Sequence, residues 1–109
     1  MQPIVRVSIM RCTPDMFAEI RQMMIEVETA LRPGIEQMRG FLAFYAGADE
    51  MTSSLTNVSL WVDLDAAKQL DRFQPMLDAG KQFIAKGATF ERPVMNYTTL
   101  WQLQPASQT

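Results

Sequence analysis

The stretch LTNVSLWV, residues 55–62, runs directly into DLDAA, residues 63–67, and this junction is the most informative part of the sequence. Polar and apolar side chains alternate along residues 55–62, which is typical of a strand with two different faces. One face of that strand carries Asn57, Ser59 and Trp61. Asp63 or Asp65 can then cap the free amides at the start of a helix. The junction therefore predicts a strand that passes straight into a helix.

A strand and a long helix are predicted upstream of this junction. Residues 4–11 alternate in the same way, and one face carries Arg6, Ser8 and Met10. Residues 13–15, Thr-Pro-Asp, favour a helix start, because threonine can cap it, proline suits its first position and aspartate favours its positive end. The apolar stripe of this helix consists of Phe17, Ile20, Met24, Val27 and Leu31. We expect Pro33-Gly34 to interrupt the helix, a further turn at residues 35–39 and an end at Gly40.

The remaining segments predict two more strands and a second helix. Residues 41–46 predict a strand rich in aromatic side chains, and a polar hairpin loop joins it to the strand at 55–62. The helix that follows the junction has an apolar stripe made of Leu70, Phe73, Leu77 and Ile84. Pro75 should kink or split this helix, and Gly87 marks its end. Residues 94–103 predict the final strand.

The predicted order is strand–helix–strand–strand–helix–strand, the split pattern of ferredoxin-like α+β domains. It gives an antiparallel four-stranded sheet with two helices on one face, in a single domain over residues 1–104, with a flexible tail at 105–109. The first, third and last strands carry apolar residues at both parities, whereas a solvated sheet face should be polar. We therefore expect a homodimer in which the sheet of a second copy covers the open face.

Composition argues against several classes of protein. The chain has 109 residues and a net charge of −2, so no basic surface for nucleic acid is expected. No apolar run reaches the roughly 18 residues of a membrane span, and residues 1–6 show no signal-peptide pattern, so we expect a cytoplasmic protein. Histidine is absent, which removes the commonest general base and metal ligand. Cys12 is the only cysteine and has no histidine or second cysteine to activate it. No cofactor or metal site is predicted, since Asp63 and Asp65 are better explained as helix caps.

Two motifs resemble the antibiotic biosynthesis monooxygenase superfamily: LWVDLDAA at residues 60–67 and RGF at residues 39–41. The order of elements resembles it over nearly the whole chain. The resemblance implies a dimeric α/β barrel with a ligand cleft between sheet and helices in each subunit. Some members oxidise aromatic polyketides without metal or flavin, with an Asn and a Trp four residues apart on the third strand, as Asn57 and Trp61 are here. Members that degrade haem use a histidine, which this chain lacks.

Strand parity predicts a polar cluster around Arg6 and Ser8. The candidate catalytic residues within it are Asn57, Trp61 and Arg6. An amide can hold a substrate oxygen, an indole can stack on a planar ligand, and a guanidinium can stabilise a phenolate or enolate. The candidate ligand-binding residues are Ser8, Ser59, Asn96, Thr98 and, from the second helix, Arg72. Each also has a purely structural explanation: Asn57 can satisfy strand or loop groups, Trp61 can fill the core, and Arg6 can pair with an acidic residue or reach solvent.

Two functions are compatible with these residues. One is a cofactor-independent monooxygenase that acts on a small planar or apolar metabolite, aromatic or polyketide-like. The other is a non-catalytic dimer that binds a small ligand, which the missing histidine favours because acid–base chemistry then rests on less suitable groups. Relatives of the superfamily include isomerases and cyclases, so the resemblance alone does not fix the function.

Overall fold

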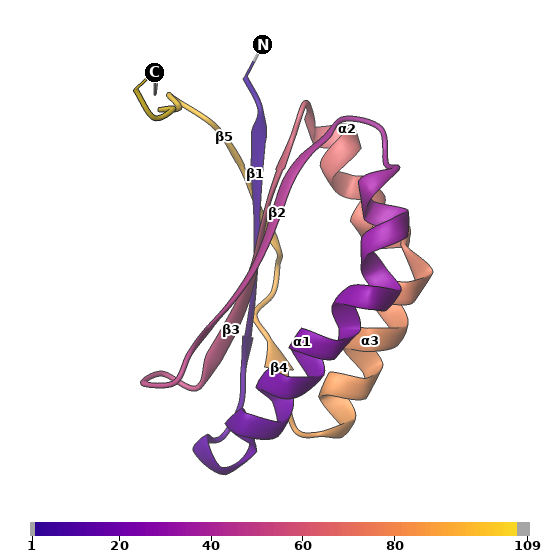
Figure 1. Ribbon diagram of the computed structural model, residues 1–109, viewed down its shortest axis with the longest axis vertical. Coiled ribbons are helices and arrows are strands. Elements are labelled where there is room, and N and C mark those ends of the chain that lie inside the picture. The colour runs from indigo at the N-terminus through magenta and orange to yellow at the C-terminus, as the bar shows by residue number, and fades with distance from the viewer. Residues whose placement is uncertain (1, 107–109) are drawn as a thin grey trace.

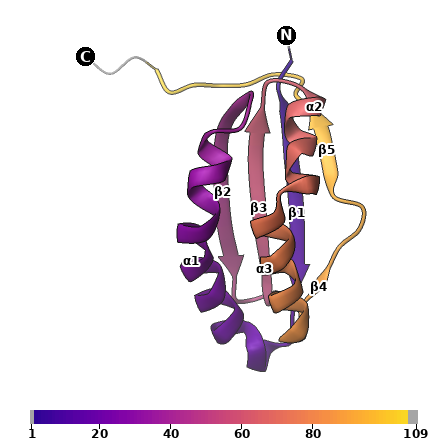
Figure 2. The ribbon, with the colours of Figure 1, turned by 90° about the vertical axis from the view of Figure 1, so that its right-hand side faces the viewer.

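A computed structural model describes residues 2–106 and shows a sheet with all its helices on one face (Figures 1 and 2). The elements are β1 (Ile4–Arg11), α1 (Pro14–Glu36), β2 (Phe41–Asp49), β3 (Ser54–Trp61), α2 (Leu64–Ala67), the 3₁₀ helix η1 (Lys68–Arg72), α3 (Gln74–Ala85), β4 (Thr89–Phe90) and β5 (Met95–Thr98). The antiparallel strands lie in the order β2-β3-β1-β4, and β5 also pairs with β1. The predicted ferredoxin-like α+β fold is confirmed. No helix among these residues is long and apolar enough to cross a membrane.

The pairing of β1 with β3 determines the helix-covered face of the sheet. Along this face the opposed residues are Ile4 and Trp61, Arg6 and Ser59, Ser8 and Asn57, and Met10 and Leu55. Side chains two positions apart on a strand point to the same side, so this face has apolar ends and a polar centre. The parities predicted for the first and third strands are confirmed.

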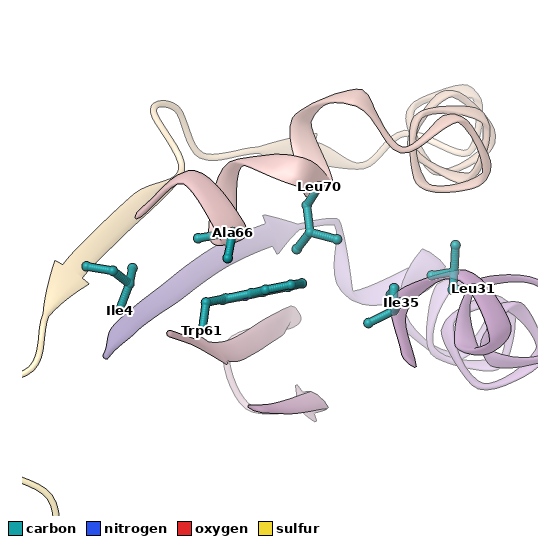
Figure 3. Packing of buried hydrophobic residues seen from close by; sticks show 7 residues of the cluster. Ile4, Leu31, Ile35, Trp61, Ala66 and Leu70 are labelled. Atoms are coloured by element: carbon teal, nitrogen blue, oxygen red, sulfur yellow. The ribbon is translucent and has the colours of Figure 1, made fainter. Parts of the chain in front are cut away.

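Each apolar end of the face packs into its own core. The Trp61 cluster consists of Ile4, Leu31, Ile35, Trp61, Ala66, Ala67 and Leu70, and Figure 3 shows the Trp61 side chain reaching under Leu70 toward Ile35. The Phe83 cluster consists of Met10, Phe17, Ile20, Leu55, Ala79, Phe83 and Ala88. Helix α1 contributes to both clusters, while Met24 and Val27 near its middle are only half-buried. The helices therefore pack tightly on the sheet at two ends rather than along its whole length.

The two motifs of the predicted resemblance contact each other at one end of the sheet. Arg39 donates to the Asp63 carboxylate at 3.0 and 3.2 Å, and Asp63 caps α2 by accepting from the Ala66 amide at 2.8 Å. The hydrogen bond from Arg39, aided by that from Ala66, holds the pKa of Asp63 below its usual value. Phe41 packs edge-on against Trp61, with 5.5 Å between ring centroids. Both motifs thus build one structural junction.

The prediction that Pro33-Gly34 interrupts the first helix is wrong. Helix α1 continues through both residues to Glu36. Gly34 faces Phe73, whose ring would lie 2.6 Å from a Cβ at position 34, so a small residue is needed for this contact. Thr13 stands at the N-cap as expected, but its side chain makes no capping hydrogen bond.

The second helical region is split, as Pro75 predicts. The break falls at Phe73, and Pro75 lies in the first turn of α3, where proline is tolerated. The apolar stripe is partly wrong, because Leu77 and Ile84 are 43% and 56% exposed. The buried positions of α3 are instead Ala79 and Phe83.

Two strand boundaries also differ from expectation. Strand β2 continues beyond Ala46 to Asp49. The final strand at 94–103 is wrong in extent, because β5 ends at Thr98 and residues 99–106 form no strand. The short strand β4, which was not predicted, pairs with the other end of β1. Residues 107–109 of the predicted tail lie outside the described residues.

Two glycine substitutions should have opposite effects on stability. Gly40 has φ +73°, and a Cβ there would overlap the Val62 side chain and lie 2.9 Å from Ala66 Cβ. Gly40→Ala should therefore lower the free energy of unfolding by roughly 2 kcal/mol or more. Gly80 is helical, and no atom lies within 4 Å of the place a Cβ would take, so Gly80→Ala should raise it by about 0.5–1 kcal/mol. Urea denaturation measures both, and equal effects of the two would contradict this account.

Candidate functional site

A cavity of about 860 Å³ lies between the sheet and the helices, and we call it the central cavity. Its floor is the polar centre of the sheet face, formed by Arg6, Ser8, Asn57, Ser59 and Asn96. Its walls are mainly apolar and include Met24 and Val27 of α1 and Leu77, Phe83 and Ile84 of α3, although charged side chains also contribute to the lining. Small-molecule sites commonly have volumes of roughly 300–1,000 Å³ and combine apolar walls with a few polar groups. The central cavity has both properties.

A smaller cavity of about 200 Å³ adjoins the central one between α1 and β2. The two share the lining residues Met24, Val27, Leu31, Phe44 and Asn57. Alone, the smaller cavity is below the usual size of a ligand site. Asn57 therefore stands at the boundary between a main chamber and a side extension of it.

Arg6 brings a buried positive charge to the floor of the central cavity. The residue is only 7% exposed, and its Nη2 donates to the Asp71 carboxylate at 2.6 Å. Its Nη1 makes a longer hydrogen bond of 3.5 Å to Asn96 Oδ1. The Asp71 side chain is 52% exposed, so water stabilises the carboxylate while the guanidinium stays inside. Two of the five guanidinium N–H groups are engaged by these contacts, which leaves others free to bind a ligand oxygen.

Asn57 carries an unpaired acceptor at the same floor. Its Oδ1 atom is buried and has no hydrogen-bond partner among the described residues. Leaving a buried polar atom unsatisfied costs about 1–3 kcal/mol, so native proteins rarely keep one without a reason. Less than 1 Å² of this atom is accessible, so the Asn57 amide would have to turn toward the cavity for a ligand hydroxyl or N–H group to satisfy it.

Trp61 is enclosed in the core rather than exposed to the cavity. Its side chain is fully buried, and its indole N–H donates to Ser59 Oγ at 2.8 Å. Ser59 does line the central cavity. Because the indole occupies a lone pair of the Ser59 hydroxyl, it orients the hydroxyl from behind the cavity floor.

The other predicted site residues divide into two groups. Ser8 and Asn96 line the central cavity as expected from strand parity, whereas Thr98 and Arg72 are exposed and do not line it. Asp71, next to Arg72, faces the cavity instead. The roles of Leu77 and Ile84 could not be read from the sequence, because their apolar spacing is equally typical of a packed core. Both residues are exposed rather than packed, and both line the central cavity.

Other kinds of reactive site find little support. Residues 2–106 contain no group of three or more His, Cys, Asp or Glu side chains that could hold a metal ion. The Cys12 thiol donates to the Ser53 carbonyl at 3.5 Å, and burial, with a smaller effect of Asp15, raises its pKa. A raised pKa disfavours the thiolate that nucleophilic chemistry needs.

Comparison with known proteins supports the fold. No protein-family model matches the chain, and no curated protein matches it in sequence. Among solved structures, a protein named for antibiotic biosynthesis monooxygenases from Deinococcus radiodurans aligns with a TM-score of 0.71 and 14% identity, over 95% of this chain and 99% of its own. SnoaB, a cofactor-independent oxygenase from Streptomyces nogalater, aligns with a TM-score of 0.65 and 16% identity, over 96% of this chain and 100% of its own.

A conserved protein from Methanosarcina mazei Go1 is similar to the same degree, with a TM-score of 0.68 and 15% identity over 90% of this chain and 93% of its own. The predicted likeness to antibiotic biosynthesis monooxygenases is thus confirmed for the fold. At such identities the fold is shared, while the chemistry has to be argued from the site.

Replacing Asp71 and replacing Arg6 should have unequal effects on the free energy of unfolding, although the two residues form one ion pair. Asp71→Asn leaves a buried guanidinium without its counter-charge, whereas Arg6→Met removes the buried charge and leaves a half-exposed carboxylate that water can solvate. We expect Asp71→Asn to lower the free energy of unfolding by about 1–2 kcal/mol, less than for a fully buried pair. Arg6→Met should cost less than Asp71→Asn. Chemical denaturation of both variants tests this, and the reverse ranking would show that Arg6 is not effectively buried.

Proposed function

We propose that this protein is a cofactor-independent monooxygenase that binds a small, planar, largely apolar metabolite with a ring hydroxyl in the central cavity. The observation that carries the proposal is the buried, unpaired Asn57 Oδ1 at a cavity floor that also holds Arg6. The structural likeness to SnoaB, a cofactor-independent oxygenase, agrees with this chemistry.

The floor residues have distinct roles in such a reaction. Asn57 Oδ1 accepts a hydrogen bond from the substrate hydroxyl and fixes the ring over the floor. The substrate loses a proton to water, and Arg6 stabilises the resulting enolate or phenolate, whose charge makes the ring electron-rich. Molecular oxygen then adds to the ring carbon of this anion, which was a CH₂ group before the proton was lost. The peroxide takes a proton back from water, and the hydroperoxide loses water and leaves a carbonyl. One oxygen atom enters the product and the other leaves as water.

The walls of the cavity fit an apolar ring system. Leu77 and Ile84 expose 43% and 56% of their surface and line the central cavity. Covering this apolar surface with a ligand is favourable by roughly 25 cal/mol per Å². Trp61 then acts as a positioning residue through Ser59.

Binding without turnover is the alternative function. The chain has no histidine, and Asp71, a carboxylate that lines the cavity, is already paired with Arg6. Asn57, Arg6 and the apolar walls would serve such a binding protein equally well, and measured oxygen consumption distinguishes the two functions.

Replacement of Asn57 should raise stability and lower activity. Asn57→Leu removes the unpaired Oδ1 and should raise the free energy of unfolding by about 1 kcal/mol. With a reduced hydroxyanthrone as substrate, the same variant should lose oxygen uptake by about tenfold or more, measured with an oxygen electrode.

The matched control is Arg72→Gln, because Arg72 is exposed and lies outside the cavity lining. It should keep wild-type oxygen uptake. Unchanged uptake in Asn57→Leu would contradict the catalytic proposal, and no uptake by the wild type across a panel of reduced aromatics would favour ligand binding without turnover.

We further propose that the protein is a homodimer through the open face of the sheet. This face carries Val5, Val7, Val58, Leu60, Met95 and Tyr97. Figure 1 shows that the segment after β5 leaves the sheet on this same side, away from the helices. The segment carries Leu100, Trp101 and Leu103, which are 86%, 76% and 79% exposed. Apolar surface on this scale favours a protein partner, and a second copy is the commonest one.

A charge placed on the open face should separate the subunits. Tyr97→Glu puts a carboxylate among these apolar side chains and should shift the mass from dimer toward monomer in light scattering at micromolar concentration. Ile25→Glu is the control, because Ile25 is 52% exposed on α1, away from this face. A monomeric mass for the wild type would refute the dimer.

A further inference from the structure

The charged residues that line the central cavity are unusual for this protein. They are four cations, Arg6, Lys68, Lys81 and Arg92, and one carboxylate, Asp71. The whole chain is acidic, with a net charge of −2. A cation-rich cavity in an acidic chain concentrates positive potential where a ligand enters, because the low-dielectric walls focus the field.

Most cations elsewhere in the chain are neutralised by a neighbour. Salt bridges are formed by Arg11 with Glu91, Arg32 with Glu28 and Glu36, Arg39 with Asp63, and Lys86 with Glu19. At the cavity only Arg6 has such a partner, and within residues 2–106 no salt bridge involves Lys68, Lys81 or Arg92. Arg92 instead lies over the ring of Phe90, 5.2 Å from its centroid, and both residues line the cavity. Three of the four cations that line the cavity therefore have no carboxylate partner among residues 2–106.

We infer that the ligand is an anion: a planar, hydroxylated compound that also bears a carboxylate. This inference rests on the proposed ligand site and adds the charge of its ligand. Arg6 binds the carboxylate with the N–H groups that Asp71 and Asn96 leave free, in the fork geometry that guanidinium and carboxylate share. Asn57 Oδ1 accepts from the ligand hydroxyl, one residue pair along the same face. Lys68 and Lys81 are exposed and attract the anion toward the cavity.

Matched probes test the charge without requiring turnover. One pair is a dihydroxyanthraquinone carboxylate and its counterpart with a hydroxymethyl group in place of the carboxylate; a smaller pair is naphthoate and naphthylmethanol. Titration calorimetry on the wild-type protein should show the carboxylate of at least one pair binding about tenfold more tightly than its neutral counterpart at low salt. This preference should shrink as salt is raised, because the exposed lysines are screened.

Variants identify the groups responsible. Arg6→Met should weaken binding of the carboxylate more than binding of the neutral probe and so abolish the preference. The double variant Lys68→Gln/Lys81→Gln changes only exposed side chains, so it keeps the test valid even if Arg6→Met folds poorly. It should weaken carboxylate binding several-fold and flatten its salt dependence. Arg21→Gln/Arg72→Gln also removes two positive charges, from exposed positions outside the cavity lining, and should change neither probe's affinity.

The outcomes separate this inference from the proposed function. Equal affinity for charged and neutral probes, or failure of both carboxylates to bind, overturns the anionic ligand. Oxygen uptake with a neutral hydroxyanthrone would in that case leave the monooxygenase proposal standing. Selective binding of the carboxylate without any oxygen uptake from reduced substrates upholds the anionic ligand and counts against the monooxygenase.

Discussion

The antiparallel register of β1 against β3 is the constraint on which the rest of the structure depends. It places Arg6 opposite Ser59 and Ser8 opposite Asn57, between two apolar pairs. Because side chains alternate between faces, a slip of one residue would turn this polar centre to the open face. The helices gain apolar contacts only at the two ends of the face, so they pack there and leave a cavity over the centre. The site is thus a direct consequence of the strand pairing.

Local sequence patterns predicted the parts of the fold that depend on near neighbours. The alternation in β1 and β3 was predicted correctly, and of the two aspartates considered as a cap, Asp63 caps α2. The predicted stripe of α1 is buried at Phe17, Ile20 and Leu31 but only half-buried at Met24 and Val27. The errors arise where distant residues decide the outcome. Gly34 suggested a helix break, yet it is small because Phe73, at the break between η1 and α3, packs on it. No local pattern contains that contact.

The strand side of the candidate site was predictable, because it depends on local alternation, whereas its helical side was not. Strand parity brought Arg6, Ser8, Asn57 and Asn96 to one face, where the structure places them. The helical side of the cavity was not predictable, because a stripe of apolar residues looks the same whether it lines a cavity or fills a core. Asp71 was missed because the break between η1 and α3 determines what that carboxylate reaches.

Trp61 matches a motif of the superfamily that the sequence resembles, but its contacts here are structural. Its ring packs on Phe41, and the neighbouring Arg39 and Asp63 form an ion pair at the same junction. These contacts are sufficient to explain why the fold uses a large aromatic residue there. Asn57 is different, because packing alone would favour an apolar side chain at a position with a buried, unpaired oxygen.

The polar centre of the sheet face costs stability, and its location explains how the protein tolerates that cost. The Trp61 cluster and the Phe83 cluster lie on either side of it, so each end of the sheet is held by its own apolar core. A buried guanidinium and an unsatisfied amide between them weaken neither core directly. Side chains that oppose folding but are retained in a cavity are most economically explained by a ligand that satisfies them. The cation-rich lining adds that this ligand should bring negative charge, because Arg6 has donors that no group of the described chain uses.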